Sequence, residues 1–194
     1  MSFFQLKSGV PIRGRGVAAV RRFALIAGAI LAMPASAQAP SVASSRAIAD
    51  EFAAKLGEEL QKSLAFIGPE LTINVCADIA PQLASDLSRR YGARVSRTSL
   101  RFRNPANAPE PWQAAVLESF DAGSEREFFE TLPDGSARYL RAIPTTGLCL
   151  ACHGTNLAAP MREKIATEYP HDRATGYSTG DIRGAFSIVW PAKP

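Results

Sequence analysis

The sequence predicts an α+β fold with one domain, in which N-terminal helices pack on an antiparallel sheet. Apolar residues recur at helical spacing between about residues 46 and 90, and shorter β-type runs separated by turn residues follow them. The chain has 194 residues, a length that suits one domain with its own core. Hydrophobic residues make up 46% of the chain, which excludes a disordered protein.

Residues 1–37 have the pattern of an export signal. They contain five basic residues and no acidic ones, and Arg21-Arg22 precedes an 11-residue apolar run from Phe23 to Met33. The small residues Pro34 to Ala37 then form a cleavage site of the Ala-x-Ala kind. We expect cleavage after Ala37, with cleavage after Ala39 as the alternative. The arginine pair leaves the twin-arginine route open, but without a fuller motif the general secretory route is favoured.

The mature chain is therefore expected to span residues 38–194 and to lie in a bacterial periplasm. An uncleaved membrane anchor is the alternative, but the apolar run is shorter than the roughly 18–20 residues that cross a bilayer. Residues 38–194 carry 17 of the 22 basic residues and all 18 acidic residues, so their net charge is −1. This balance excludes the basic surface that a nucleic-acid partner would need.

Two helices are expected at the start of the mature chain. Ser45 can cap a helix from Arg46 to Phe66, and Gly68-Pro69 ends it. Pro69 suits the first turn of a second helix that runs to about Arg90, with a kink or restart at Pro81. The apolar stripes consist of Ile48, Phe52, Ala53, Leu56, Leu60 and Leu64 in the first helix, and of Ile73, Cys76, Ile79, Ala80, Leu83 and Leu87 in the second.

The second half of the chain indicates a sheet. Its clearest signal is a hairpin, in which strands Phe128–Leu132 and Ser136–Ile143 flank the turn Pro133-Asp134-Gly135. Two more strands are expected at Arg94–Phe102 and Gly184–Trp190. The segments between strands are predicted as a loop at Asn104–Pro109, a short helix from Pro111, a cysteine-containing turn, a short helix near Pro160–Tyr169 and a polar loop at Pro170–Gly180.

The segment Cys149-Leu150-Ala151-Cys152-His153 reads Cys-x-x-Cys-His, the attachment signature of c-type haem. Two intervening residues place both sulfurs on one side of a tight turn, where they can form thioethers with two positions of one porphyrin. His153 follows at once and can point its ring at the iron. Export agrees with this assignment, because bacteria attach c-type haem outside the cytoplasm. The sequence predicts one covalent haem c on Cys149 and Cys152, with His153 as an axial iron ligand.

Three other uses of the cysteines remain open. A thioredoxin-like redox pair needs a strand before the motif and a long helix after it, whereas Pro144 and Gly147 precede this motif. A zinc site that includes Cys76 would require the adjacent Cys152 and His153 to bind one tetrahedral ion. A plain disulfide would leave the third cysteine unpaired in an oxidising compartment.

The second axial ligand has few candidates after residue 37. Met161 lies only eight residues after His153, a short span in which to reach the other face of the haem. His171 has more chain to work with but lies in a polar loop. Cys76 lies on the apolar stripe of the second helix and therefore faces inward, and iron coordination would account for an unpaired exported thiol. The alternative role of Cys76 is that of a small hydrophobic core residue.

Several long motifs occur in one order along the chain. They are Cys76 to Pro81, Leu100 to Pro109, Cys149 to Gly154, Tyr169 to Tyr177 and Gly180 to Ser187. In these motifs the chain resembles a family of exported proteins with a single c-type haem and a PAS-like fold, first catalogued as a domain of unknown function. Related domains occur in the sensor regions of some signalling proteins. The resemblance covers nearly all of the mature chain.

The resemblance implies a PAS-like α+β fold with covalent haem on Cys149 and Cys152. It also implies that His153 is one axial ligand and that Cys76 is the other. The position of His171 is not fixed in the family pattern, which weakens His171 as a ligand.

Two functions of different classes follow from this ligand set. An anionic thiolate favours ferric iron, so we expect a low reduction potential. Two filled axial positions argue against a peroxidase or oxygenase, and we expect no enzyme activity. The first hypothesis is a sensor of redox state or of a small ligand, in which a change at the iron loosens the thiolate. The second is a periplasmic low-potential electron-transfer cytochrome, and a haem-free zinc or disulfide domain is the third.

Either haem function requires a redox or signalling protein as partner, which the sequence does not identify. The candidates for binding the haem propionates are Arg101, Arg103, Arg183 and Tyr177. Surface arginines often have no such specific role, so these four residues are the least constrained part of the expected site.

Overall fold

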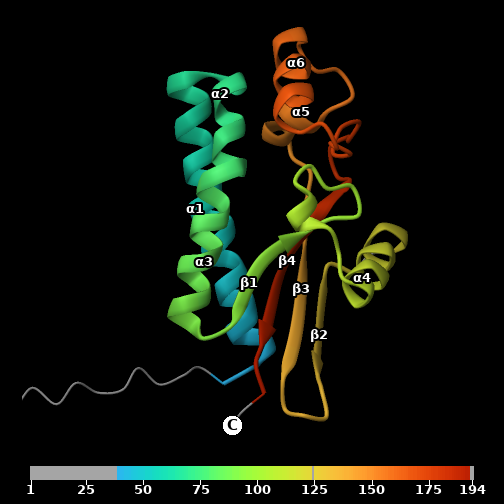
Figure 1. Cartoon of the computed structure of the whole chain (residues 1–194). Helices are drawn as coiled ribbons and strands as arrows, with labels where there is room; N and C mark the ends of the chain where they lie inside the picture. Colours follow the sequence, from blue (N-terminus) through green and yellow to red (C-terminus); the bar gives the residue numbers. More distant parts are fainter. Residues whose placement is uncertain (1–38, 124, 193–194) are drawn as a thin grey trace, which may run out of the picture. The chain divides into compact units, whose positions relative to one another are not determined.

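The structure, a computed structural model, describes residues 39–123 and 125–192. The export signal expected at residues 1–37 lies outside these residues. From Val42 onward the chain forms a group of helices, then four strands with further helices before the second strand and before the fourth (Figure 1). The predicted α+β class, with N-terminal helices on an antiparallel sheet, is confirmed.

Helix α1 (Val42–Ile67) begins one turn earlier than predicted. The Ser41 hydroxyl accepts a hydrogen bond from the Ser44 amide at 3.0 Å and so caps the helix. Ser45, the predicted cap, is fully buried, and its hydroxyl accepts a hydrogen bond from the indole N–H of Trp190 at 2.9 Å. The prediction was wrong because a contact with the far end of the chain engages the side chain that could have capped locally.

The second predicted helix consists of three segments. Helix α2 (Pro69–Asn74) is followed by a π-helical turn, η1 (Val75–Ile79), and then by α3 (Ala80–Tyr91). The kink or restart predicted at Pro81 is confirmed, because the irregular turn ends at Ile79 and a regular helix restarts at Ala80, next to this proline. Gly92 ends α3 in the left-handed conformation with φ of 67°, which glycine adopts without a steric penalty.

The sheet is antiparallel throughout, in the order β1-β4-β3-β2. Its strands are β1 (Arg94–Thr98), β2 (Glu127–Thr131), β3 (Ala137–Pro144) and β4 (Ile182–Trp190). Pairing of β2 with β3 confirms the predicted hairpin. The last strand thus lies in the middle of the sheet, between the first strand and the hairpin.

Strand β1 is shorter than predicted, because the chain leaves the sheet after Thr98 rather than after Phe102. The Ser99 amide donates a hydrogen bond to the Asn107 carbonyl at 3.1 Å. The Ser99 hydroxyl donates another to the Arg183 carbonyl at 2.8 Å. These bonds fold residues 99–107 over the end of the sheet instead of extending it.

The remaining helices follow the predicted order, with one addition. Helix α4 (Pro111–Ala122) and helix α6 (Ala159–Glu168) lie where short helices were expected. Helix α5 (Gly147–His153) replaces the predicted turn around the cysteines, and a 3-10 turn, η2 (Pro105–Asn107), lies in the expected loop. None of the helices in the described part of the chain is long and apolar enough to span a membrane.

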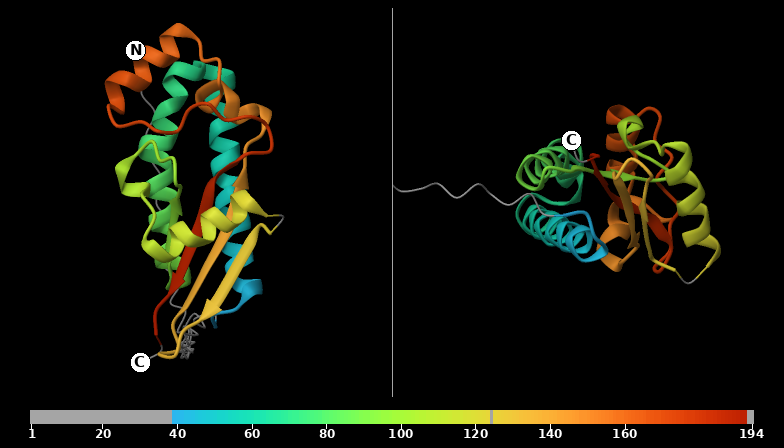
Figure 2. Two further views of the ribbon diagram at one scale, coloured as in Figure 1. Left: turned by 90° about the vertical axis from the view of Figure 1, so that its right-hand side faces the viewer. Right: turned by 90° about the horizontal axis from the view of Figure 1, so that it is seen from below.

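The two faces of the sheet are covered by different helices, as the view from below shows (Figure 2). Neighbouring residues of a strand point to opposite faces, so Tyr139 and Leu140 of β3 belong to different cores. The first core joins α1 and α3 to the sheet through Phe52, Leu87, Tyr139, Phe186 and Ile188. The second joins α4 to the sheet through Leu117, Phe120, Leu140 and Ala185. A third joins α2 to α6 through Ile73, Leu157, Met161 and Ile165.

Candidate functional site

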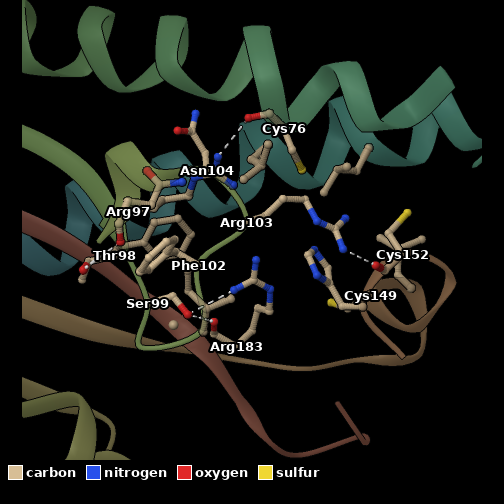
Figure 3. A pocket seen from close by; sticks show the side chains of 18 of the residues that line it. Cys76, Arg97, Thr98, Ser99, Phe102, Arg103, Asn104, Cys149, Cys152 and Arg183 are labelled. Atoms are coloured by element: carbon tan, nitrogen blue, oxygen red, sulfur yellow. Dashed lines mark hydrogen bonds between the residues drawn. The ribbon is translucent and has the colours of Figure 1, made fainter. Parts of the chain in front are cut away.

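A pocket lies between the helical layer and one end of the sheet, next to α5 (Figure 3). The enclosed cavity has a volume of about 150 Å³, and it opens to solvent on one side. Cys76, Cys149, Cys152 and His153, the residues predicted to bind haem, all line it. The apolar walls are formed by Leu56, Leu60, Leu64, Phe102, Ile143, Leu148, Tyr169 and Phe186.

Helix α5 presents the Cys-x-x-Cys-His motif to the pocket. The Thr146 amide contacts the Cys149 sulfur at 3.4 Å at the start of the helix. Cys149 and Cys152 are three residues apart, so their side chains share a face of the helix. Gly154 ends the helix, and a Cβ at this position would lie 2.6 Å from the Leu150 carbonyl oxygen. A larger residue is therefore sterically excluded directly after His153.

The His153 ring is held as a neutral imidazole with one free nitrogen. Its Nδ1 lies 2.6 Å from the Ala174 carbonyl oxygen, and because a carbonyl only accepts, Nδ1 carries the proton. Burial, together with the positive charges of Arg183 and Arg103, lowers the pKa of His153 well below its usual value. The Nε2 atom therefore keeps its lone pair, as a metal ligand requires.

Arg103 joins the motif to the segment that contains Ala174. Its guanidinium donates to the Cys152 carbonyl at 2.7 Å and to the Asp172 carboxylate at 2.8 Å. The Asp172 carboxylate also accepts a hydrogen bond from the Ala174 amide at 3.2 Å. The two charged side chains are only 6% and 9% exposed, so this is a buried ion pair that aligns the carbonyl partner of His153.

The three candidates for a second axial ligand lie in different surroundings. Cys76 is half-buried in η1 and lines the pocket from the helical wall (Figure 3). Met161 is 1% exposed and packs in the core between α2 and α6, outside the pocket lining. His171 is exposed on the loop after α6. Only Cys76 shares a pocket with His153 among these candidates.

Of the candidates for propionate binding, Arg183 has the most suitable surroundings. Its guanidinium lines the pocket and donates to the Ser99 hydroxyl at 3.2 Å and to the Arg101 carbonyl at 3.4 Å. Burial and the neighbouring charges of Arg103 and Arg97 lower the pKa of Arg183. No carboxylate among the described residues forms an ion pair with it, so this half-buried positive charge is available to an anionic ligand.

Arg103 lines the same pocket but is paired with Asp172, and the last two propionate candidates lie elsewhere. Arg101 and Tyr177 line a second cavity beside α4, and the guanidinium of Arg101 stacks on the Tyr177 ring at 4.2 Å. Sequence reasoning missed Arg97, which lines the main pocket. Strand alternation could have found it, because Arg97 shares a face of β1 with the core residue Val95.

The haem-free alternatives find little support in this arrangement. All three cysteines are free thiols, and burial raises the pKa of Cys152. Within residues 39–123 and 125–192, no three His, Cys, Asp or Glu side chains are grouped so that they could hold a metal ion. The motif lies inside a helix that ends at His153, whereas a thioredoxin-like pair precedes a long helix.

The donor set fits an iron porphyrin. Two thiols on one helix face, a neutral imidazole beside them and a third thiol from another wall line one mainly apolar pocket. Arg183 adds an unpaired positive charge of the kind that a carboxylate neutralises.

Comparisons with known proteins agree with this fit. The family model for Tll0287-like proteins matches residues 26–191. Among solved structures, the crystal structure of the cyanobacterial haem protein Tll0287 is similar, with a TM-score of 0.63 and 26% sequence identity. The similarity covers 78% of this chain and 94% of the Tll0287 chain. The comparison with curated proteins finds no match.

The Arg103–Asp172 pair gives a first testable prediction. Asp172→Asn removes the carboxylate and leaves the buried guanidinium uncompensated, which we expect to cost about 3–5 kcal/mol of unfolding free energy. The matched control is Glu58→Gln, which breaks an exposed ion pair with Lys62 on α1 and should leave stability unchanged. Chemical denaturation measures both. Equal stability of the two variants would show that the buried pair does not hold this segment.

Proposed function

We infer the function from the family to which this chain belongs, the Tll0287-like proteins. We propose that the protein is an exported c-type haem protein that senses redox state or a small ligand. Haem binding follows from its similarity to a solved haem protein across most of both chains. The observation that carries the proposal further is that Cys76, Cys149, Cys152 and His153 converge on one pocket.

Each of these residues has a distinct role in the proposal. Cys149 and Cys152 hold the haem through thioether bonds, and His153 binds the iron through Nε2 because its Nδ1–H is bonded to Ala174. Cys76 supplies the second axial ligand as a thiolate. Arg183 neutralises a propionate. When bound, the haem supplies an iron that exchanges one electron, and the thiolate favours its ferric state.

Sensing is favoured over electron transfer by the place of Cys76 in the fold. The ligand lies in an irregular turn between α2 and α3, and these two helices pack on different partners, α6 and the sheet. Release of the Cys76 sulfur would therefore free a junction between two packed regions. We propose that a separate signalling or redox protein detects this change, and that the protein acts in the periplasm without enzyme activity of its own.

One observation favours the alternative, a low-potential electron carrier. Leu148 adjoins Cys149, lines the pocket and is 40% exposed. An exposed apolar residue at the edge of a redox site suits the small, transient interfaces of electron-transfer proteins.

Covalent attachment is tested by producing the chain with its signal together with the c-haem maturation machinery. We expect haem to stay with the polypeptide on a denaturing gel, because thioether bonds survive unfolding. The Cys149→Ser/Cys152→Ser variant is the control and should lose its haem on the same gel. Haem lost from the wild-type chain, with maturation shown to work on another cytochrome, contradicts the c-type assignment.

The role of Cys76 is tested by the ferric absorption spectrum. Cys76→Ala should keep its haem but change the spectrum, because the thiolate is removed from the iron. Met161→Leu and His171→Ala remove the other two candidate ligands and should leave the spectrum unchanged. A spectral change in either control with none in Cys76→Ala would transfer the role to that residue.

Carbon monoxide separates the two haem functions. In a sensor, the reduced wild-type protein should change its visible spectrum on addition of carbon monoxide, because Cys76 yields its place. An electron carrier should instead undergo repeated reduction and oxidation with both axial residues retained and no response to carbon monoxide. Stopped-flow absorption measures the response, and its absence argues for the electron carrier.

A further inference from the structure

The main-chain carbonyl oxygen of Cys76 does not accept the hydrogen bond that a regular α-helix would give it. In an α-helix the Ala80 amide would bond to the Cys76 carbonyl, but here it donates to the Val75 carbonyl, one residue further back. In a π-helical turn the Cys76 carbonyl would instead accept from the amide of residue 81, five positions later. This residue is Pro81, which has no N–H. The helix therefore provides no donor for the Cys76 carbonyl.

Pro81 also accounts for the widened turn. In a regular α-helix the proline ring would collide with the carbonyl of Ala77, four residues earlier. Taking one extra residue into the turn relieves this collision. Each residue of a regular helix adds about 100° of rotation, so an extra residue changes which way the preceding side chains face relative to those that follow. Thus α3 can face the sheet while Cys76 faces the pocket.

Arg97 supplies the missing donor. Its guanidinium donates to the Cys76 carbonyl oxygen at 3.4 Å, across the gap between β1 and the helical layer (Figure 3). No acidic partner forms an ion pair with Arg97 in the part of the chain that the structure describes. The main chain of Arg97 pairs with Phe186 of β4 in the sheet. Its side chain extends to the helical segment that carries Cys76.

We propose that Pro81 and Arg97 are positioning residues for Cys76, the first by widening the helix and the second by binding the carbonyl that the widened helix exposes. The proposal rests on the proposed role of Cys76 as an iron ligand. A proline would otherwise only interrupt this helix, and the half-buried Arg97 on β1 would have no partner. Together they fix the one ligand that comes from outside the Cys-x-x-Cys-His segment.

The first test compares Pro81→Ala with Pro69→Ala in the haem-bound protein. Pro81→Ala permits a regular helix, so its ferric spectrum should shift to that of Cys76→Ala while haem attachment persists. Pro69 occupies the first turn of α2, where no amide partner is lost, so Pro69→Ala should keep the wild-type spectrum. A wild-type spectrum in Pro81→Ala overturns the role of Pro81.

The second test concerns Arg97 and separates the charge from the rest of the side chain. Arg97→Met should lose the wild-type spectrum, and Arg97→Lys, which keeps a charged donor, should restore it at least in part. Arg94→Met removes an exposed arginine from the same strand and should have no spectral effect. Equal spectra for wild type and Arg97→Met overturn the role of Arg97.

A double-mutant cycle tests whether the two residues act on one carbonyl. Arg97→Met should lower the melting temperature by about 3 °C in the wild-type background, the effect of one lost charged hydrogen bond. It should have less than half this effect in Pro81→Ala, because the Ala80 amide then serves Cys76. Equal effects in both backgrounds overturn the coupling. Making all four proteins of the cycle in the Cys76→Ala background keeps the residue 76 carbonyl and removes the thiolate, so the coupling measured there does not depend on iron ligation.

Discussion

The rest of the site depends on the hydrogen bonds and the ion pair made by the buried guanidinium of Arg103. A charge removed from water must be paired on every side, and Arg103 meets this requirement with groups from two separate segments, the Cys152 carbonyl and the Asp172 carboxylate. Asp172 in turn holds the amide of Ala174, whose carbonyl binds His153. Because each of these groups satisfies the next, the motif helix and the loop after α6 cannot shift independently.

The pocket combines a rigid wall with an irregular one. On the α5 side, Gly154 and Tyr177 pair as an isolated β-bridge. Its main-chain hydrogen bonds hold this wall together with the side-chain bonds of Arg103. On the helical side, Cys76 lies in a π-turn, a form that is common at functional sites and less regular than the helices that flank it. A proposed iron ligand on the less regular wall suits a protein in which one ligand is released and the other is retained.

Local charge and overall charge differ in this protein. Residues 38–194 are close to neutral, which gave no indication of an anionic ligand. The pocket nevertheless gathers Arg97, Arg103 and Arg183 without a lining carboxylate. Asp172 pairs with Arg103, whereas Arg97 and Arg183 form no ion pair with the described residues and can attract an anionic ligand. A net charge averages over the whole surface, whereas binding depends on which charges are buried together.

The sequence by itself determined the features that depend on short spans of chain. The Cys-x-x-Cys-His spacing, the helix ends at Gly68 and Gly92 and the hairpin turn at 133–135 are set by covalent geometry and by residues with special backbone preferences. The inward position of Cys76 followed from helical spacing. These features could be predicted because neighbouring residues alone decide them.

Only the tertiary structure decided the features that depend on distant partners. Ser41 rather than Ser45 caps α1 because Trp190, 145 residues from Ser45, engages the Ser45 hydroxyl. Arg103 is a buried structural residue because it pairs with Asp172, 69 residues further along the chain. The partner of a buried polar group is chosen by the packing of the whole chain, and no local pattern encodes that choice.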